Sequence, residues 1–146
     1  AKAPSRPLLL VGDVGTGKTH LAVCALWEIV RADAYGQFVS ALDYGRRVRE
    51  TWTVRREDTE RSLLNQYVRV QALVIDELGA NRSADESIIQ DLIAARYDAG
   101  MMPLTIIVSN LAPAVLEKAI GSRAADRIRE GATLVTLTGQ SRRAPL

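Results

Sequence analysis

The chain has 146 residues, of which 47% are apolar and 25% are charged, and these proportions suit one globular domain with a real core. The net charge is only +2, no apolar run approaches the ~20 residues that span a bilayer, and the start shows no signal-peptide pattern. A single cysteine excludes a disulfide framework within the chain and a cysteine metal site. We therefore expect a cytoplasmic protein with no membrane partner.

The identity of the basic residues is more informative than the net charge. Sixteen of the nineteen basic residues are arginine, which suits planar, two-point contacts with phosphate better than lysine does. The alternative explanation for the excess of arginine over lysine is a coding bias towards arginine. The chain starts with alanine and reaches its first apolar run almost at once. We therefore expect residues 1–146 to be one domain of a longer protein, with an N-terminal partner domain missing.

Strands and helices are expected to alternate along the chain. Apolar runs predict strands at residues 8–11, 37–41, 72–75, 104–108 and 134–137. Helical spacing, capping residues and terminating glycines predict four helices. These cover residues 18–34, run from the capping box at 83–86 to Gly100, begin at Pro113, and cover 122–130. The stretch 42–71 is polar, arginine-rich and helical in tendency. This alternation predicts an α/β domain with a parallel sheet covered on both faces, which binds ligands at the carboxyl ends of its strands.

The stretch VGDVGTGKTH follows the first strand and has the pattern of a phosphate-binding loop. It matches G-x-x-x-x-G-K-[ST] through Gly12, Gly17, Lys18 and Thr19. Glycines let backbone amides wrap a phosphate, and the helix N-terminus adds its positive end. Lys18 would reach the β- and γ-phosphates and Thr19 would bind Mg²⁺; a glycine-rich turn without a ligand is the alternative. The candidate ATP-binding residues of this loop are Gly12, Asp13, Val14, Gly15, Thr16, Gly17, Lys18, Thr19 and His20, the last with no assigned chemistry.

Polar residues also end two later strands. In ALVIDE, Asp76 would hold Mg²⁺ and Glu77 can polarise an attacking water as a general base. Asn110, which ends the strand in IIVSN, can orient that water or contact the γ-phosphate. The guanine-reading pattern N-K-x-D is absent from the sequence, which argues against a GTPase. Glu77 as a surface acid and Asn110 as a turn residue are the alternatives.

Three arginines in SRAADRIREG lie late in the chain, at the edge away from the phosphate loop: Arg123, Arg127 and Arg129. An arginine there reaches a nucleotide held by an adjacent copy more easily than its own, and a positive side chain near the γ-phosphate assists hydrolysis. The other interpretation is pairing within the helix, Arg123 with Asp126 and Arg127 with Glu130. The two interpretations do not exclude each other.

Taken in order, five segments resemble the bacterial helicase-loader and transposition-helper AAA+ ATPases of the DnaC, DnaI and IstB type: GDVGTGKTHLA, LVIDELGA, IIVSNL, SRAADRI and GQSRR. The resemblance covers essentially the whole chain. It implies a P-loop, three-layer α/β/α sandwich with a five-stranded sheet of order 5-1-4-3-2 and little or no helical lid. It also implies Mg-ATP as cofactor, with Lys18 and Thr19 as the Walker A pair, Asp76 and Glu77 as Walker B, and Asn110 as the first sensor.

The resemblance assigns Arg127 as an arginine finger acting in trans, in a homo-oligomer with active sites between subunits. The C-terminal pattern of the family is Gly-x-Ser-aromatic-Arg. Gly139, Ser141 and Arg143 fit it, whereas Arg142 stands where an aromatic is common. Arg143 is therefore favoured as the second sensor and as a ligand of ATP; a solvated basic tail is the alternative.

A cluster of arginines surrounds Trp52 in YGRRVRETWTVRRED. Cations that follow a nucleic-acid backbone, with an aromatic for stacking, are what single-stranded DNA binding requires. A solvated helix face balanced by acids, with Trp52 packed on the core, is the alternative. The candidate DNA-binding residues are Arg46, Arg47, Arg49, Arg55 and Arg56.

The function expected from these features is that of an ATP-dependent DNA replication helicase loader. It would hydrolyse Mg-ATP slowly, couple the ATP state to single-stranded DNA, and meet a replicative ring helicase through the missing N-terminal domain. A transposition helper that assembles on duplex DNA is the runner-up. A nucleotide-switch adaptor that barely turns over is a second class, and a small-molecule kinase a third, for which no lid or acceptor pocket is found in the sequence.

Overall fold

The computed structural model describes residues 6–53, 59–80, 86–101 and 104–142. Three predicted site residues, Arg55, Arg56 and Arg143, lie outside the described residues.

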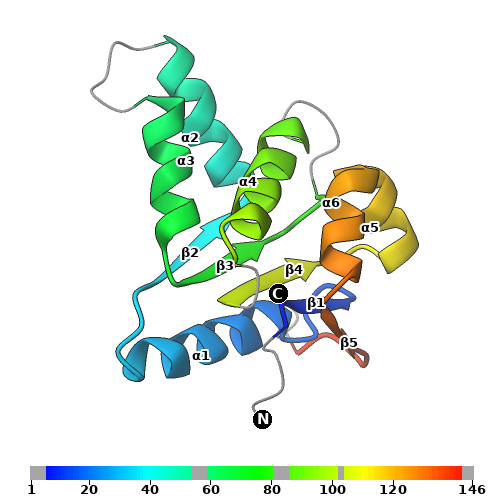
Figure 1. Cartoon of the computed structure of the whole chain (residues 1–146). Coiled ribbons are helices and arrows are strands. Elements are labelled where there is room, and N and C mark those ends of the chain that lie inside the picture. The colour runs from blue at the N-terminus through cyan, green and yellow to red at the C-terminus, as the bar shows by residue number, and fades with distance from the viewer. Residues whose placement is uncertain (1–5, 54–58, 81–85, 102–103, 143–146) are drawn as a thin grey trace.

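A parallel sheet of five strands forms the middle layer (Figure 1). The strands are β1 (Leu8–Gly12), β2 (Gly36–Ser40), β3 (Ala72–Asp76), β4 (Thr105–Ser109) and β5 (Thr133–Leu137). Their order is β2-β3-β4-β1-β5, and every neighbouring pair is parallel. The predicted order 5-1-4-3-2 is confirmed, since it is the same order read from the other edge. All residues of β3 and β4 are buried, as expected for central strands of a parallel sheet whose middle residues are apolar.

Helices cover both faces of the sheet. They are α1 (Lys18–Arg31), α2 (Ala41–Thr53), α3 (Glu60–Arg69), α4 (Glu86–Asp98), α5 (Pro113–Ile120) and α6 (Ser122–Arg129). Among the described helices, α1 lies on one face and the others lie on the opposite face (Figure 1). The predicted three-layer α/β/α sandwich is therefore confirmed.

Some element ends differ from the prediction. Residue Ala41 was expected in the second strand but begins α2, because the Ser40 hydroxyl accepts a backbone N–H of the first helical turn at 3.0 Å. The polar stretch 42–71 contains two helices, and the second starts at a capping box in which Thr59 and Ser62 accept each other's backbone N–H groups.

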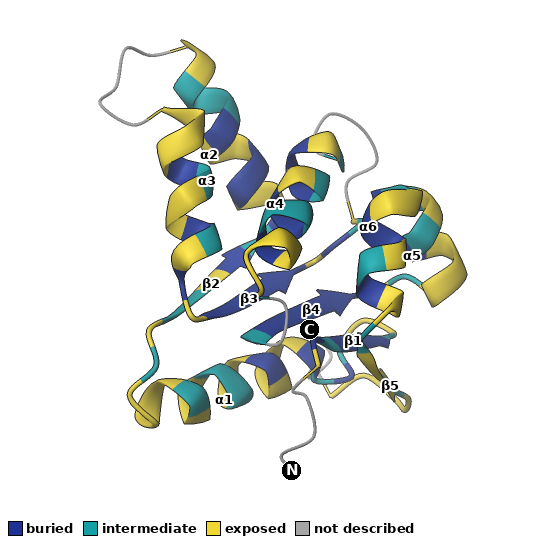
Figure 2. Cartoon of the chain, in the orientation of Figure 1, coloured by how far each residue is buried: buried dark blue, intermediate teal, exposed yellow. Residues whose placement is uncertain are grey.

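Two apolar cores lie on the two faces of the sheet. The larger one lies under α2 to α6 and includes Ile75, Leu92 and Ile107, all with no exposed surface. The smaller one packs Ala22 of α1 against Leu10 and its neighbours. Burial is densest at the central strands, whereas β5 at one edge and much of α1 are exposed (Figure 2).

One fully buried arginine joins three elements of the larger core. Arg96 of α4 is 0% exposed and donates hydrogen bonds to the carbonyls of Tyr67 and Val70 at 2.8 and 2.9 Å, where α3 ends. It also donates to the hydroxyl of Thr105 at 2.9 Å and to the carbonyl of Met101 at 3.1 Å. Burial lowers the pKa of Arg96 to about 10, so the side chain remains charged at neutral pH. A positive charge suits this position because the last carbonyls of a helix have no partner within it.

Candidate active site

The phosphate loop connects β1 to α1 in a shape that its glycines permit. Gly12 has φ 141°, and a Cβ there would lie 2.1 Å from the carbonyl oxygen of Leu137 on β5. Gly17 has φ 95°, and nothing lies within 4 Å of the position its Cβ would take. The Thr16 hydroxyl donates to the Asp13 carbonyl at 2.8 Å and closes the loop on itself. Gly12 is therefore needed for strand packing, while Gly17 leaves open space at the start of the helix.

Lys18 lies inside the loop. Its side chain is buried, and its ammonium donates to the Asp13 carbonyl at 2.5 Å and to the Thr16 hydroxyl at 3.4 Å. These contacts place a positive charge where the N-terminus of α1 already contributes its partial positive charge. The combination suits an anion with several oxygens, as in a polyphosphate.

Thr19 and Asp76 meet across the sheet. The Thr19 hydroxyl donates to Asp76 Oδ2 at 2.9 Å, and Asp76 Oδ1 accepts the backbone N–H of Glu77 at 2.8 Å. Asp76 is buried with its carboxylate turned towards the loop. A hydroxyl beside a carboxylate is a donor set that fits Mg²⁺, which prefers hard oxygen ligands and few protein groups.

The ends of β3 and β4 are held together by Ser109. Its hydroxyl donates to the Leu78 carbonyl at 2.7 Å and accepts the N–H of Leu111 at 3.1 Å. The Leu78 N–H also donates to the Val108 carbonyl at 2.9 Å. These bonds hold Glu77 and Asn110, the exposed residues on either side of them, at the same edge of the sheet. Ser109 is not among the residues that the motifs predict for the site; a polar residue at the end of the apolar run 106–108 was the available signal.

Glu77 itself has an unusual backbone, with φ 56° in the left-handed region. A residue other than glycine seldom adopts this conformation without cause. Here the Asp76 carboxylate binds the Glu77 N–H, and the chain must turn at once so that Leu78 pairs with β4.

A cavity of about 460 Å³ brings these groups together. The groups come from the phosphate loop, the ends of β3 and β4, and the segment after β5. Its lining residues are Val14, Gly15, Gly17, Lys18, Thr19, His20, Asp76, Glu77, Val108, Ser109, Asn110 and Arg142. Three of the predicted loop residues do not line the cavity: Gly12, Asp13 and Thr16. Asp13 and Thr16 instead hold the shape of the loop through their hydrogen bond.

The segment after β5 returns to the phosphate loop. The backbone N–H of Arg142 donates to the Gly15 carbonyl at 2.9 Å. Gly15 has φ 83°, and a Cβ there would lie 2.2 Å from the Ser141 hydroxyl oxygen. Arg142 lines the cavity. Arg143, which the sequence favoured as the second sensor, lies outside the described residues.

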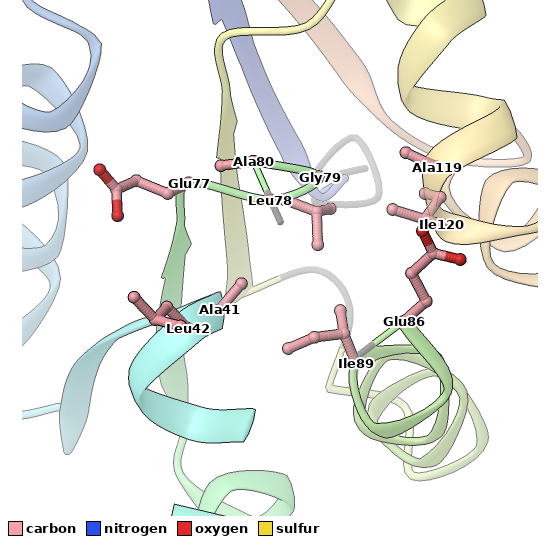
Figure 3. A pocket seen from close by; sticks show the side chains of 10 residues that line it. All are labelled: Ala41, Leu42, Glu77, Leu78, Gly79, Ala80, Glu86, Ile89, Ala119 and Ile120. Atoms are coloured by element: carbon pink, nitrogen blue, oxygen red, sulfur yellow. The ribbon is translucent and has the colours of Figure 1, made fainter. Parts of the chain in front are cut away.

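A second hollow of about 210 Å³ lies on the other side of Glu77, between the start of α2, the turn after β3, and helices α4 and α5. Leu78, Ile89 and Ile120 line it, and the Glu77 side chain points away from it (Figure 3). Glu77 borders both cavities, and the direction of its side chain places the carboxylate on the side away from the smaller one.

Arg127 lies on α6 and does not line the cavity of its own chain. Its Nη2 lies 3.6 Å from Asp98 Oδ1, and its guanidinium carbon lies 5.3 Å from the centre of the Tyr97 ring. Arg127 thus contacts the end of α4, whereas one interpretation of the sequence paired it with Glu130 within its own helix. Arg129 is the residue that pairs with Asp126, at 3.5 Å.

The arginine cluster on α2 has partners on its own chain. Arg46 pairs with Asp43 at 3.0 Å, and Arg47 donates to the Tyr67 hydroxyl at 2.8 Å. Trp52 is 60% exposed and donates its indole N–H to Glu60 at 2.7 Å, so the alternative in which Trp52 packs on the core is wrong. Arg46, Arg47 and Arg49 lie in the middle of α2, and α2 lies on the face of the sheet opposite α1 (Figure 1).

Two further observations concern only the residues that the structure describes. No group of three or more histidine, cysteine, aspartate or glutamate side chains is placed to hold a metal ion there. No helix in the same ranges has the length and apolar character needed to cross a membrane.

Comparison with known proteins identifies the family. The family described as IstB-like ATP binding protein matches residues 4–145, and the chain belongs to it. The replicative helicase loader DnaC of Buchnera aphidicola subsp. Baizongia pistaciae (strain Bp) is 32% identical over 124 residues, which are 84% of this chain and 50% of that protein. The chain thus spans half the length of this curated relative.

Solved structures agree with this assignment. The crystal structure of the DnaC helicase loader has a TM-score of 0.80 at 27% identity, over 92% of this chain and 80% of that one. The replication initiator DnaA bound to AMPPCP and single-stranded DNA has a TM-score of 0.77 at 23% identity, over 94% and 42% of the two chains, and shows the same fold. The predicted P-loop AAA+ fold and the resemblance to the DnaC, DnaI and IstB type are confirmed.

Proposed function

We propose that this IstB-like domain binds Mg-ATP in the larger cavity and hydrolyses it. The observation that carries the proposal is the convergence of Lys18, Thr19, Asp76, Glu77 and Asn110 on one cavity at the carboxyl ends of β1, β3 and β4. Loop amides, an ammonium, a carboxylate with a hydroxyl, and a second carboxylate are the groups that phosphoryl transfer to water requires.

The roles follow from position. Lys18 would exchange its loop contacts for the β- and γ-phosphates, and Thr19 and Asp76 would hold Mg²⁺, which supplies charge neutralisation when bound. The Glu77 carboxylate would accept a proton from the attacking water, and the Asn110 amide would orient that water. Arg142, which lines the cavity, is a candidate for a γ-phosphate contact from the segment after β5, beside Arg143.

Arg127 would complete the site of a neighbouring copy. Its position on α6, outside the cavity of its own chain, supports action in trans and a homo-oligomer with active sites between subunits. A guanidinium beside the γ-phosphate is worth about 10³–10⁵ in rate where such fingers have been measured. An isolated chain should therefore hydrolyse ATP slowly.

The biological role that fits is helicase loading coupled to single-stranded DNA. The similarity to a replicative helicase loader supports it, as do the exposed Arg46 and Arg47 of α2 and the exposed Trp52 on the same helix. A DnaA structure with the same fold holds single-stranded DNA. The chain spans half of that relative, so contact with a ring helicase is proposed by analogy with the loader and not from a described surface.

The test of trans hydrolysis is ATP turnover per subunit as a function of protein concentration. The rate should rise with concentration. Mixing Lys18→Ala subunits with Arg127→Ala subunits should restore activity that neither has alone, because each supplies what the other lacks. A rate per subunit that stays constant, together with an inactive mixture, would contradict the proposal. Release of phosphate in the absence of any acceptor separates an ATPase from a kinase and from a switch that only binds.

A transposition helper is the second candidate, and the family to which the chain belongs carries the IstB-like description that favours it. Such a protein would assemble on duplex DNA. Affinity for single and double strands, measured with and without a non-hydrolysable ATP analogue, distinguishes the two roles: a gain for single strands supports the loader, and a gain for duplex supports the helper.

A further inference from the structure

We infer that Tyr97 and Asp98, at the C-terminal end of α4, are positioning residues for Arg127, which keep its guanidinium ordered at the surface that an adjacent copy would meet. This inference rests on the proposed function, because Arg127 takes part in hydrolysis only if it acts on a neighbour. It adds Tyr97 and Asp98, which belong to no sequence motif, to the residues through which one subunit would assist hydrolysis in its neighbour.

The contacts form a small frame around one guanidinium. The Tyr97 ring lies under it, with 5.3 Å between the guanidinium carbon and the ring centre, and Asp98 lies beside Nη2 at 3.6 Å. The ring is itself held in place, since the Tyr97 hydroxyl donates to Glu130 Oε2 at 2.5 Å. This hydrogen bond and the negative charge of Glu130 raise the pKa of Tyr97, so the phenol keeps the proton that the bond needs. Two helices, α4 and α6, are thereby joined at the base of Arg127.

These contacts restrict the rotamers of Arg127 and leave N–H groups of its guanidinium available for other partners. A free arginine samples many rotamers, and each contact it makes in a transition state must first overcome that entropy. A ring face and one carboxylate select few of these rotamers in advance. The Asp98 contact is an ion pair longer than a hydrogen bond, and 30% of the Arg127 side chain is exposed. The outer N–H groups therefore remain able to reach a phosphate.

Arg129, two residues further along α6, shows the contrast. Its Nη2 is engaged by Glu117 of α5, and its Nη1 lies 3.5 Å from Asp126 of its own helix. Both ends of that guanidinium face carboxylates of the same chain. Arg127 has a ring beneath it in place of the second carboxylate.

The test uses the mixture of Lys18→Ala and Arg127→Ala subunits and adds each substitution to one of the two. The Lys18→Ala subunit is the donor, because it supplies Arg127 and holds no nucleotide. The Arg127→Ala subunit is the receiver, because it holds ATP and depends on the arginine of its neighbour. Tyr97→Ala or Asp98→Asn in the donor should lower ATP turnover of the mixture by roughly ten- to a hundred-fold, the scale expected when a catalytic group is misplaced by about 1 Å. The same substitutions in the receiver should leave turnover within about two-fold.

Two further variants sharpen the result. Tyr97→Phe keeps the ring and loses only the bond to Glu130, so in the donor it should have a smaller effect than Tyr97→Ala. Tyr35→Ala, a change to an exposed tyrosine beside β2, should have no effect in either component. Activity of the Tyr97→Ala receiver shows that the substituted chain folds and binds ATP.

The outcomes separate the inference from the function it rests on. Loss confined to the donor supports the positioning role. Equal loss in donor and receiver, or loss in neither, overturns it while leaving Arg127 as a trans finger. A parent mixture without any regained activity overturns the trans assignment, and the positioning role falls with it.

Discussion

The Thr19 hydroxyl donates a hydrogen bond of 2.9 Å to the Asp76 carboxylate, across 57 residues of sequence. Thr19 lies in the first turn of α1 and Asp76 ends β3; β4 separates β3 from β1, the strand that leads into the phosphate loop. The bond shows that the two proposed magnesium ligands are already within reach of a single ion. Binding of the ion would then require a change of partner rather than a movement of the backbone.

Thr19→Ala should weaken nucleotide binding only when magnesium is present. The methyl side chain removes one hard oxygen and leaves the loop amides and Lys18 unchanged. We expect at least a roughly ten-fold loss of affinity for ATP with Mg²⁺, on the scale seen for altered metal sites, and little change with a chelator. Titration of a fluorescent ATP analogue under both conditions measures it. Thr133→Ala, at the exposed start of β5, is the control; an equal loss with and without magnesium would contradict the metal assignment.

Glu77→Gln should separate binding from turnover. The amide preserves the shape of the side chain and cannot accept the proton of the attacking water. Turnover should fall by roughly 10²–10⁴, the usual contribution of a general base, while ATP affinity stays within a few-fold. Single-turnover hydrolysis and equilibrium binding test the two halves. Glu86→Gln, on the rim of the second hollow, is the matched control, and a Glu77→Gln variant with unimpaired turnover would remove Glu77 from catalysis.

Gly15→Ala should release the segment after β5 from the phosphate loop. Its Cβ would lie 2.2 Å from the Ser141 hydroxyl, at a residue with φ 83°. Gly100→Ala provides the control, because Gly100 has a similar φ of 70° and nothing within 4 Å of its Cβ position. Both should be destabilised by about 1 kcal/mol from backbone strain, but only Gly15→Ala should also lose ATP affinity. Thermal unfolding with and without nucleotide compares them, and equal nucleotide-induced shifts would speak against the docking of this segment.

Arg96→Met should destabilise the fold strongly although Arg96 is far from any predicted motif. Methionine fills similar space but leaves buried carbonyls at the end of α3 without a donor. We expect a loss of roughly 3–5 kcal/mol in the free energy of unfolding, since several buried acceptors are affected at once. Urea titration measures it. Arg31→Met, at an exposed residue paired with Glu28, should cost no more than about 0.5 kcal/mol. Similar midpoints for the two would show that the Arg96 bonds contribute little.

Arg46, Arg47 and Arg49 changed together to alanine should lower the affinity for single-stranded DNA. The prediction assumes that Arg46 and Arg47 exchange their contacts with Asp43 and Tyr67 for phosphates. The slope of log affinity against log salt should become less steep by about 0.7 per lost contact. A control with the same loss of charge is Arg31, Arg69 and Lys118 changed together, since all three are exposed and lie elsewhere. Equal effects of the two triple variants would assign the binding to net charge alone.

The structure also explains which parts of the site could be predicted. The phosphate loop and the strand ending in Asp76 and Glu77 are local patterns, in which a few adjacent residues carry both the conformation and the chemistry. Their positions therefore follow from spacing alone. The place of Arg142 at the cavity does not, because it depends on the path of the chain over Gly15, which is remote in the sequence. Ser109 was missed for a related reason: its role depends on Leu78, which is on another strand.

The amino-acid sequence by itself determined the alternation of strands and helices, the sheet order through its family resemblance, and the residues of the phosphate loop. These properties depend on periodicity and on backbone geometry over a few residues. Only the tertiary structure decided that Arg96 is buried under the end of α3 and that Arg127 lies against Tyr97 and Asp98. An exposed arginine and a buried one are the same letter in the sequence, and what distinguishes them is the set of carbonyls, rings and carboxylates that the packing of distant helices brings within reach.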